Sequence, residues 1–313
     1  MRGRHVTWLA VIVLALLFVF VNSGLDFAYV IPKRLARLAA MVIGGVCVAC
    51  SAIAFQTLSG NRILTPAIMG YEAVYLLLHA LLVLAMGVQG LLILGNDGNF
   101  LLSLLVLLGY SWALHRWLFR GASSNVFFLL LVGLVLTMVM ATLTQFVQLK
   151  VSPGEFSMLQ GYSQASFNRA SPRLLLASAV LVAVLCTLLA RTAPVLDVLA
   201  LGRDQAISLG VDYRRSMHLQ LAIIAALVTV STSLLGPTAF MGVFVANITY
   251  AVAGTFRHRV TLALGSGVAI GVFISAQMLV EHVFNYKTTV GILVNLVCGT
   301  YFLMLMVRTR GAA

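Results

Sequence analysis

The segment LGRDQAISLGVDYRRSMHL, Leu201 to Leu219, carries five charged side chains among nineteen residues, and a long apolar run lies on each side of it. The whole chain is 61% hydrophobic and only 9% charged. Soluble domains are roughly 45–50% apolar and about 25% charged. A short polar segment in so apolar a chain indicates a connection that leaves the membrane between two membrane-spanning helices.

Apolar runs long enough to cross a bilayer, about 20 residues each, recur along the whole chain. We therefore expect an all-α integral membrane protein whose ten membrane-spanning helices form one domain over residues 1–313. The predicted spans are 6–22, 36–55, 73–94, 100–118, 125–149, 173–190, 217–235, 238–254, 260–280 and 289–307. The first run imitates a secretory signal peptide, but no A-x-A cleavage pattern follows it, which favours a membrane helix over a cleaved signal.

The positions of the basic residues predict the orientation of the chain. With the N-terminus inside, thirteen Lys and Arg residues fall in inner segments and seven in outer ones. Because inner loops carry the excess of positive charge, both termini and Leu201–Leu219 are expected in the cytoplasm. This bias also accounts for the net charge of +12. No nucleic-acid-binding motif is present, so no nucleic-acid partner is expected.

Ionisable residues at membrane depth are costly and usually functional, and this chain has few. Glu72, Tyr75 and His79 share one helical face, which indicates either a hydrogen-bonded cluster facing a water-filled cavity or a proton relay. Glu281 falls at an outer helix end, where we expect it to be solvated. Cys47 and Cys50 lie inside an apolar run without a second pair of ligands, which favours packing over a metal site.

Sequence motifs of catalysis are also missing. The chain has no H-E-x-x-H, no Walker A loop and no credible G-x-S-x-G turn, so we predict no catalytic residue, no metal site and no cofactor bound by this chain. If the chain moves a substrate, the energy is expected to come from another subunit.

Three irregular stretches interrupt the apolar pattern. GNRILTPAIMG (60–70) and LLGPTAFMG (234–242) place Gly, Pro and polar residues at predicted membrane boundaries. Irregular backbone there is tolerated only inside protein or beside a cavity, so these stretches are either tight turns or a pair that lines a translocation path. The polar connection 152–172, expected on the outer side, is either a solvated loop, a re-entrant segment or a docking surface.

The opening segment contains a predicted amphipathic helix at about 199–211. Pro194 is expected to end the preceding span, while Gly202 and Gly210 bracket the helix. The helix either rests on lipid headgroups or docks into a groove of a cytoplasmic protein, and periodicity alone slightly favours the first. Its apolar stripe consists of Leu199, Ala206, Ile207 and Val211.

Four blocks of the sequence resemble the FecCD-type permeases, the membrane subunits of ABC importers for iron–siderophore complexes, haem and vitamin B12. LALGRDQAISLGV is similar to their coupling-helix pattern L-G-x-x-x-A-x-x-L-G. Residues 33–70 resemble the R-x-x-R…G…Q…N-x-x-x-x-P-x-x-L-G block. Residues 236–250 resemble G-x-I-x-F-V-G-L-x-x-P-H-x-x-R, and residues 288–306 the closing block. The ten-helix subunit of that family agrees with the ten spans expected here.

The resemblance implies roles for particular residues. Arg34 and Arg37, as exposed charges, would dock a substrate-binding protein. Coupling to a separate ATPase would fall on Leu201, Gly202, Arg203, Ala206, Leu209 and Gly210. The translocation pathway would be lined by Gln56, Asn61, Thr65, Pro66, Gly70, Gly236, Pro237, Phe240 and Gly242. ATP and Mg²⁺ would bind the ATPase rather than this chain.

The resemblance also implies a function. The chain would be the permease subunit of an ATP-driven importer that carries a ferric siderophore across the bacterial inner membrane, with vitamin B12 or haem as alternative substrates. Its partners would be a second permease, two ATP-binding subunits and a periplasmic or lipoprotein substrate-binding protein. ANITY (246–250), KTTVG (287–291) and GYEAVY (70–75) depart from the family pattern, which favours a heterodimer of permeases. A proton-coupled secondary transporter and a membrane-embedded structural subunit remain open.

Overall fold

A computed structural model describes residues 2–22, 24, 26–118, 126–169, 171–238 and 240–310. Within these ranges the secondary structure is entirely helical, as the sequence predicts. The helices are α1 (Arg2–Phe20), α2 (Val30–Ser59), the 3₁₀ helix η1 (Pro66–Met69), α3 (Tyr71–Leu118), α4 (Val126–Gln148), α5 (Pro153–Tyr162), α6 (Pro172–Leu199), α7 (Arg203–Ser208), α8 (Tyr213–Leu235), α9 (Met241–Ala253), α10 (His258–His282) and α11 (Val290–Arg310).

The described residues contain the expected number of apolar helices. Six helices are long and apolar enough to cross a membrane, and four more apolar helices are shorter, which makes ten. The short ones include the first part of α3, Tyr71–Gly87, and the whole of α9. At 1.5 Å per residue, the 13 residues of α9 reach about 20 Å, less than the roughly 30 Å of a bilayer core. The predicted eighth span is therefore a helix of about two-thirds of the length needed to cross the bilayer core.

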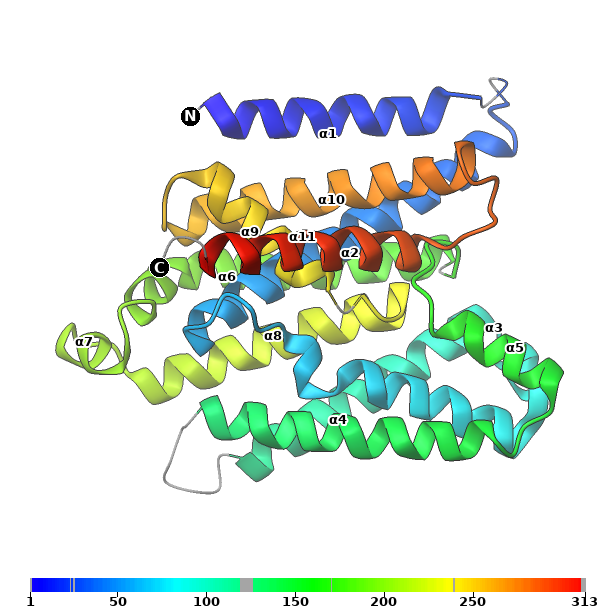
Figure 1. Ribbon diagram of the computed structural model, residues 1–313, viewed down its shortest axis with the longest axis horizontal. Helices are drawn as coiled ribbons and strands as arrows, with labels where there is room; N and C mark the ends of the chain where they lie inside the picture. The colour runs from blue at the N-terminus through cyan, green and yellow to red at the C-terminus, as the bar shows by residue number, and fades with distance from the viewer. Residues whose placement is uncertain are drawn as a thin grey trace.

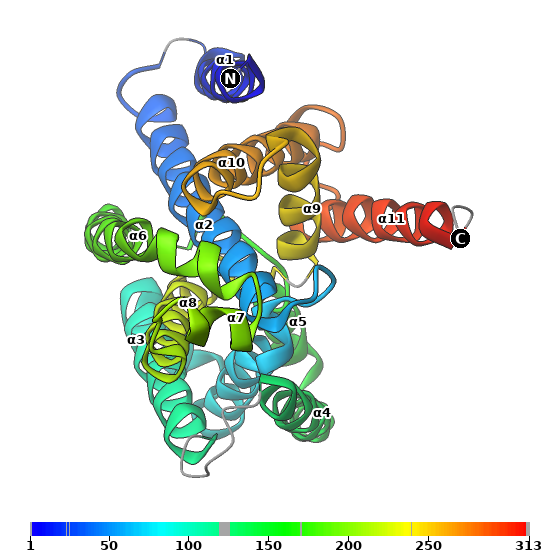
Figure 2. The same ribbon diagram turned by 90° about the vertical axis from the view of Figure 1, so that its left-hand side faces the viewer.

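Helices α2, α8 and α10 form the centre of the bundle (Figure 2). In the most apolar windows of α2 and α8, 78% of residues are buried, compared with 22% in α4. Glycines allow the central helices to approach closely, as is typical of membrane bundles. A Cβ atom at Gly44 would lie 2.2 Å from Leu235 Cδ1 of α8, and one at Gly45 would lie 3.0 Å from Ile270 Cγ1 of α10.

Two predicted helix boundaries are wrong. Gly87 and Gly95 adopt φ values of 63° and 61° inside α3, so the helix is first broken at Gly87, seven residues before the predicted end of that span at residue 94. The intervening residues are apolar, and hydropathy alone does not separate them from a membrane span. Pro194 lies inside α6, which continues to Leu199. The missing N–H of one proline removes a single helical hydrogen bond, which a long helix in a bundle tolerates.

The two ends of the bundle differ in what they carry (Figure 1). The start of α1, the end of α11 and the protruding α7 lie at one end, called here the α7 end. The opposite end, called the α5 end, carries α5, the connection 163–169 and the turn between α10 and α11. The chain therefore begins and ends on the side of α7, which agrees with the predicted topology.

Candidate functional site

The first broken segment, residues 60–70, leads from the α7 end into the middle of the bundle (Figure 1). Gly60 ends α2 with a φ of 62°. Thr65 is extended, Pro66 begins η1 and Gly70 ends η1 with a φ of 89°. Glycine and proline therefore stand where the backbone changes direction, and the predicted irregular segment is confirmed.

The second broken segment, residues 236–238 with Phe240, connects α8 to the short helix α9. Gly236 has a φ of 89° and a ψ of −166°, a conformation that disfavours a side chain. A Cβ atom there would also lie 2.7 Å from the guanidinium of Arg169 and 3.3 Å from the carbonyl oxygen of Gln164. The chain at Gly236 therefore passes directly beneath the connection between α5 and α6.

The two broken segments meet inside the bundle. The backbone N–H of Thr238 donates to Oε1 of Glu72, at the start of α3, over 2.7 Å. A Cβ atom at Gly242 would lie 3.1 Å from Thr65 Cγ2 and 3.0 Å from Ala52 Cβ. Stretches about 170 residues apart in sequence are thus in contact inside the bundle, through one hydrogen bond and one glycine.

A small polar cavity lies at this junction. Its volume is about 30 Å³, room for one or two water molecules. Its polar lining comes from both broken segments and from the helices α2, α3 and α8. The residues at its wall include Ser51, Thr65, Pro66, Glu72, Ser231, Thr232, Thr238 and Gly242. Three of the predicted pathway residues, Thr65, Pro66 and Gly242, are therefore brought together.

Gln56 faces a different space at the α7 end. Its Nε2 donates to the carbonyl oxygen of Arg62 over 2.8 Å, and Nδ2 of Asn247 in α9 donates to the same oxygen over 3.3 Å. These bonds hold the start of the first broken segment against α2 and α9. A cavity of about 750 Å³ opens beside them, with Gln56, Arg62, Asp197, Leu201, Tyr250 and His258 among its lining residues.

The remaining predicted pathway residues do not share one cavity. Asn61 is exposed, and its Oδ1 accepts a hydrogen bond from the Ile63 N–H over 2.9 Å. Gly70 lies beneath the hydroxyl of Tyr110, 2.8 Å from where a Cβ atom would stand. Phe240 is 52% exposed at the start of α9. These residues border the broken segments without meeting at their junction.

Helix α7 is short and projects from its end of the bundle (Figure 1). Within this helix the side chain of Ala206 is fully buried against the bundle. In contrast, Leu201, Ile207 and Leu209 are 57%, 52% and 62% exposed. Viewed from that end, α7 lies over the middle of the bundle rather than at the rim that lipid surrounds (Figure 2). Exposed apolar side chains in that position favour contact with a protein over contact with headgroups.

Two glycines set the conformation of α7, as the sequence predicts. Gly202 precedes the helix with a φ of 102°, and Gly210 follows it with a φ of 80°. The N–H of Val211 bonds the carbonyl of Ala206 over 3.0 Å and that of Gly210 bonds Ile207 over 2.9 Å, a Schellman ending. Arg203 lies over the ring of Tyr213. The helical turn itself spans only Arg203–Ser208, shorter than the predicted 199–211.

At the α5 end, Arg34 and Arg37 are not the pair of free surface charges that we expected. Arg34 is only 9% exposed, and its Nη1 donates to the carbonyls of Phe18 and Val21 over 2.9 and 2.5 Å. It thereby satisfies carbonyls that the end of α1 leaves unpaired. Arg37 donates to Oε1 of Glu281 over 2.9 Å. The predicted exposure is wrong for Arg34, while a docking role for either arginine stays a prediction.

Glu281 is likewise buried rather than solvated, at 8% exposure. Its carboxylate lies 2.9 Å from Arg37 and 4.0 Å from Arg34, and it accepts a hydrogen bond from Gln277 over 2.7 Å. Arg37 also donates to Oδ1 of Asn168 over 2.5 Å. This network joins α2, α10 and the connection before α6.

The predicted face of Glu72, Tyr75 and His79 divides into separate groups. His79 stacks on Tyr162 with ring centroids 4.2 Å apart, and its Nδ1 lies 2.9 Å from the Tyr75 carbonyl oxygen. Glu72 instead bonds the second broken segment. Tyr75 and His79 border a cavity of about 60 Å³, which matches the predicted hydrogen-bonded cluster beside a cavity.

Arg169 is a residue that sequence reasoning did not single out. Its guanidinium donates to the carbonyls of Gly161 and Gln164 over 2.5 and 2.8 Å and to the Tyr75 hydroxyl over 3.2 Å. Arg169 therefore links the connection 163–169 to α3 above Gly236. The signal available in the sequence was a lone arginine in the polar stretch FNRASP beside a membrane span.

Comparisons with known proteins place this architecture in a family. Residues 5–308 match the model of the FecCD transport family. The petrobactin import system permease protein YclO of Bacillus subtilis is 34% identical over 93% of this chain and 92% of the relative. FatC, the petrobactin import system permease protein of Bacillus anthracis, is 31% identical over 91% of this chain and 80% of that protein.

The fold is also found among solved structures. A metal-chelate type ABC transporter in an inward-facing conformation superposes with a TM-score of 0.85 at 17% identity, over 97% of this chain and 98% of the other. That similarity shows that the two chains share the same overall fold. Since the family model covers almost the entire sequence, the chain belongs to the FecCD transport family, the membrane permeases of ABC importers.

Proposed function

We propose that this chain is the permease subunit of an ATP-driven importer that moves a ferric siderophore complex across the bacterial inner membrane. The observation that carries the substrate class is the similarity of nearly the whole chain to two petrobactin permeases, at 34% and 31% identity. More distant relatives include permeases for vitamin B12 and hemin, at 27% and 26% identity. Those two substrates are the alternatives.

The pathway lies between two permeases rather than within one. The cavity at the junction of the broken segments holds only about 30 Å³, whereas sites for ligands the size of drugs hold about 300–1,000 Å³. Helix α4 packs against η1, and α11 packs against α9, so α4 and α11 flank the broken segments. A second, related permease covering this face would place the junction at the border of a shared pathway.

Energy enters through α7 from an ATP-binding subunit. The exposed apolar side chains of Leu201, Ile207 and Leu209 fit a groove on such a partner, and Ala206 anchors α7 on the bundle. The large cavity that reaches Leu201 also reaches Arg62 near the start of the first broken segment. Movement of α7 would therefore act on the pathway through a short path of contacts. ATP and Mg²⁺ bind that partner.

Transport of defined chelates tests the substrate. The complete importer, assembled in liposomes from this chain, its second permease, its ATPase and its binding protein, is expected to accumulate ⁵⁵Fe-petrobactin when ATP is supplied inside. Ferric hydroxamate, cobalamin and haem serve as competing substrates in the same vesicles. Faster uptake of one of these than of petrobactin would contradict the proposed substrate class. Uptake that needs a proton gradient and no ATP would contradict the importer itself.

A heterodimer is the proposed assembly, because ANITY (246–250) and KTTVG (287–291) depart from the family pattern. Co-purification tests it. When a tagged copy of this chain is expressed with the second permease and an untagged copy of itself, the second permease is expected to be retained and the untagged copy lost. A transport-competent complex that contains this chain as the single type of permease would contradict the heterodimer.

A further inference from the structure

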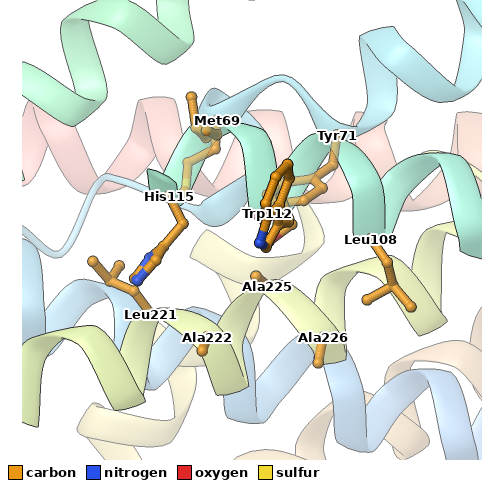
Figure 3. A pocket seen from close by; sticks show the side chains of 11 residues that line it. Met69, Tyr71, Leu108, Trp112, His115, Leu221, Ala222, Ala225 and Ala226 are labelled. Carbon is orange, nitrogen blue, oxygen red and sulfur yellow. Dashed lines mark hydrogen bonds between the residues drawn. The ribbon is translucent and has the colours of Figure 1, made fainter. Parts of the chain in front are cut away.

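An apolar crevice of about 230 Å³ lies between the second half of α3 and α8 (Figure 3). Its floor on α8 is made of small residues, among them Ala222, Ala225 and Ala226. Its α3 wall carries Leu108, Trp112 and His115, and its inner end is closed by Met69 and Tyr71. The small residues on one side and the large apolar ones on the other leave an apolar slot between the two helices.

The crevice opens to the outside of the bundle. Trp112 is 66% exposed and Leu108 is 39% exposed, whereas Tyr71 and Met69 at the inner end are 0% and 4% exposed. The α3–α8 side of the bundle lies away from α11, across the centre formed by α2 (Figure 2). It is therefore separate from the face proposed above for the second permease, and the surrounding solvent at this depth is lipid.

Positive charge gathers at the α7 end of the same crevice. Arg116 lies over the ring of Trp112, 5.6 Å from its centroid. His115 Nε2 lies 2.9 Å from His218 Nδ1 of α8, and Arg214 is one helical turn before His218 on the same face. Both arginines are exposed. The nearby carboxylate of Asp212 caps α8 by accepting the Arg215 N–H over 3.0 Å, so the local balance is positive.

We propose that this crevice is a binding site for an anionic phospholipid. One acyl chain occupies the slot between α3 and α8 as far as Tyr71, and the phosphate lies at the α7 end between Arg116 and Arg214. Basic residues beside a groove between membrane helices attract anionic headgroups in this way, and an exposed tryptophan beside them suits the interface. A zwitterionic lipid would fill the slot equally well but would gain little from the arginines.

Fluorescence quenching of Trp112 tests the site. The full chain with Trp8→Phe and Trp117→Phe, which leaves Trp112 as the single tryptophan, is reconstituted in phosphatidylcholine. A minor fraction of lipid with brominated acyl chains is then added, either phosphatidylglycerol or phosphatidylcholine. Brominated phosphatidylglycerol is expected to quench with an apparent affinity higher by about fivefold for each arginine it engages at low salt. Raising the salt concentration should reduce this preference.

Variants separate the site from the surrounding lipid. Arg214→Gln, which leaves the Trp112 contact of Arg116 intact, is expected to lower the preference for phosphatidylglycerol by about fivefold. Ala225→Phe should fill the slot and abolish the preference. The matched controls are Arg173→Gln at the other end of the bundle and Ala179→Phe on the exposed side of α6. Both controls should leave the preference for phosphatidylglycerol unchanged.

Equal quenching by the two brominated lipids would show that bulk lipid occupies the crevice and would overturn the proposal. A preference that persists in both Arg214→Gln and Ala225→Phe would place the anionic lipid elsewhere on the protein and would overturn it as well. Neither result bears on petrobactin transport, so the lipid experiment and the transport experiment test the two proposals independently.

Discussion

The two ends of the bundle treat charged and apolar side chains in opposite ways. At the α5 end, Arg34, Arg37 and Arg169 donate hydrogen bonds to carbonyls and carboxylates of the same chain. At the α7 end, Arg203 lies on an exposed helix, and Leu201 and Leu209 are more than half exposed. These three arginines are satisfied within the chain, whereas α7 presents side chains that a partner could bury.

This difference suggests that the α5 end is rigid and that α7 can move. Buried charges with satisfied hydrogen bonds hold their surroundings in one arrangement, because any displacement leaves a charge unpaired at low dielectric. A helix of six residues attached through two glycines has few such restraints. We therefore expect substitutions at the α5 end to act on folding and substitutions at α7 to act on coupling.

Glu281→Ala is expected to have the largest effect on stability. It leaves Arg34 and Arg37 without their carboxylate at a largely buried position, and breaking a buried ion pair in this way costs about 3–5 kcal/mol. Thermal unfolding of the purified protein in detergent measures the loss. The matched control is Asp26→Ala, an exposed carboxylate at the same end of the bundle. Unfolding temperatures that fall equally for both variants would contradict the proposed rigidity of the network.

Gly242→Val tests the junction of the broken segments. The added side chain would push against Thr65 and Ala52, and an overpacked contact of this kind costs about 1–3 kcal/mol. We expect siderophore uptake to fall by about tenfold, since 1.4 kcal/mol corresponds to a factor of ten. Thr65→Ala in the same chain should restore part of the rate. Gly109→Ala, whose Cβ atom would meet open space, is the control.

Normal uptake by Gly242→Val in protein of normal stability would show that the junction lies outside the pathway. An equal loss of uptake in Gly109→Ala would mean that any added methyl group in these helices slows transport. In that case the contact between Gly242 and Thr65 would matter no more for transport than other helix contacts.

Leu209→Asp tests the contact of α7 with the ATP-binding subunit. Leu209 is 62% exposed, so a carboxylate there should leave the permease folded but weaken its contact with the ATP-binding subunit. Loss of one apolar anchor of an interface costs about 2 kcal/mol, or about thirtyfold in affinity. Pull-down of the ATPase and transport-coupled ATP hydrolysis measure it. Leu149→Asp, 83% exposed at the other end, is the control; equal losses in both variants would contradict docking at α7.

Much of this arrangement follows from hydropathy and glycine spacing. The ten apolar helices and the short helix between Gly202 and Gly210 are confirmed because each depends on local composition or on a local φ requirement. The break at Gly87 is missed because it lies within an apolar run, whereas the break at Gly95 falls in the predicted connection between residues 94 and 100. The burial of Glu281 is missed for a different reason, since its partners Arg34 and Arg37 lie about 245 residues away in sequence.

The site shows the same division. Sequence alone indicates that residues 60–70 and 234–242 are irregular, and it leaves open whether each is an independent turn. Their contact through Thr238, Glu72 and Gly242 depends on the packing of α2, α8 and α9 around them. Long-range contacts of this kind leave no pattern in the local sequence. Glycine and proline positions therefore predict the two irregular segments but not the contact between them.

The smallest expected effect concerns α5, where even the end of a helix is satisfied internally. Ser152 and Glu155 form a capping box: the backbone N–H and the hydroxyl of Ser152 donate to Glu155 Oε2 over 2.9 and 2.8 Å. These hydrogen bonds, first from the backbone and then from the hydroxyl, hold the pKa of Glu155 below its ordinary value. Because this pKa is lowered in the folded chain, the charged carboxylate stabilises the folded helix at pH values above the ordinary pKa of glutamate.

This stabilisation is lost as the pH falls through the lowered pKa. Hydrogen–deuterium exchange of residues 153–162, corrected for intrinsic rates, should therefore show full protection at pH 7 and a loss of protection as the pH falls below the ordinary pKa of glutamate, about 4.3. Ser152→Ala should show reduced protection at pH 7 and a weaker dependence on pH. If wild type and Ser152→Ala lose protection in parallel, α5 is held by its packing on α3 rather than by its cap. The contrast between the two ends would then rest on Arg34, Arg37 and Arg169 alone.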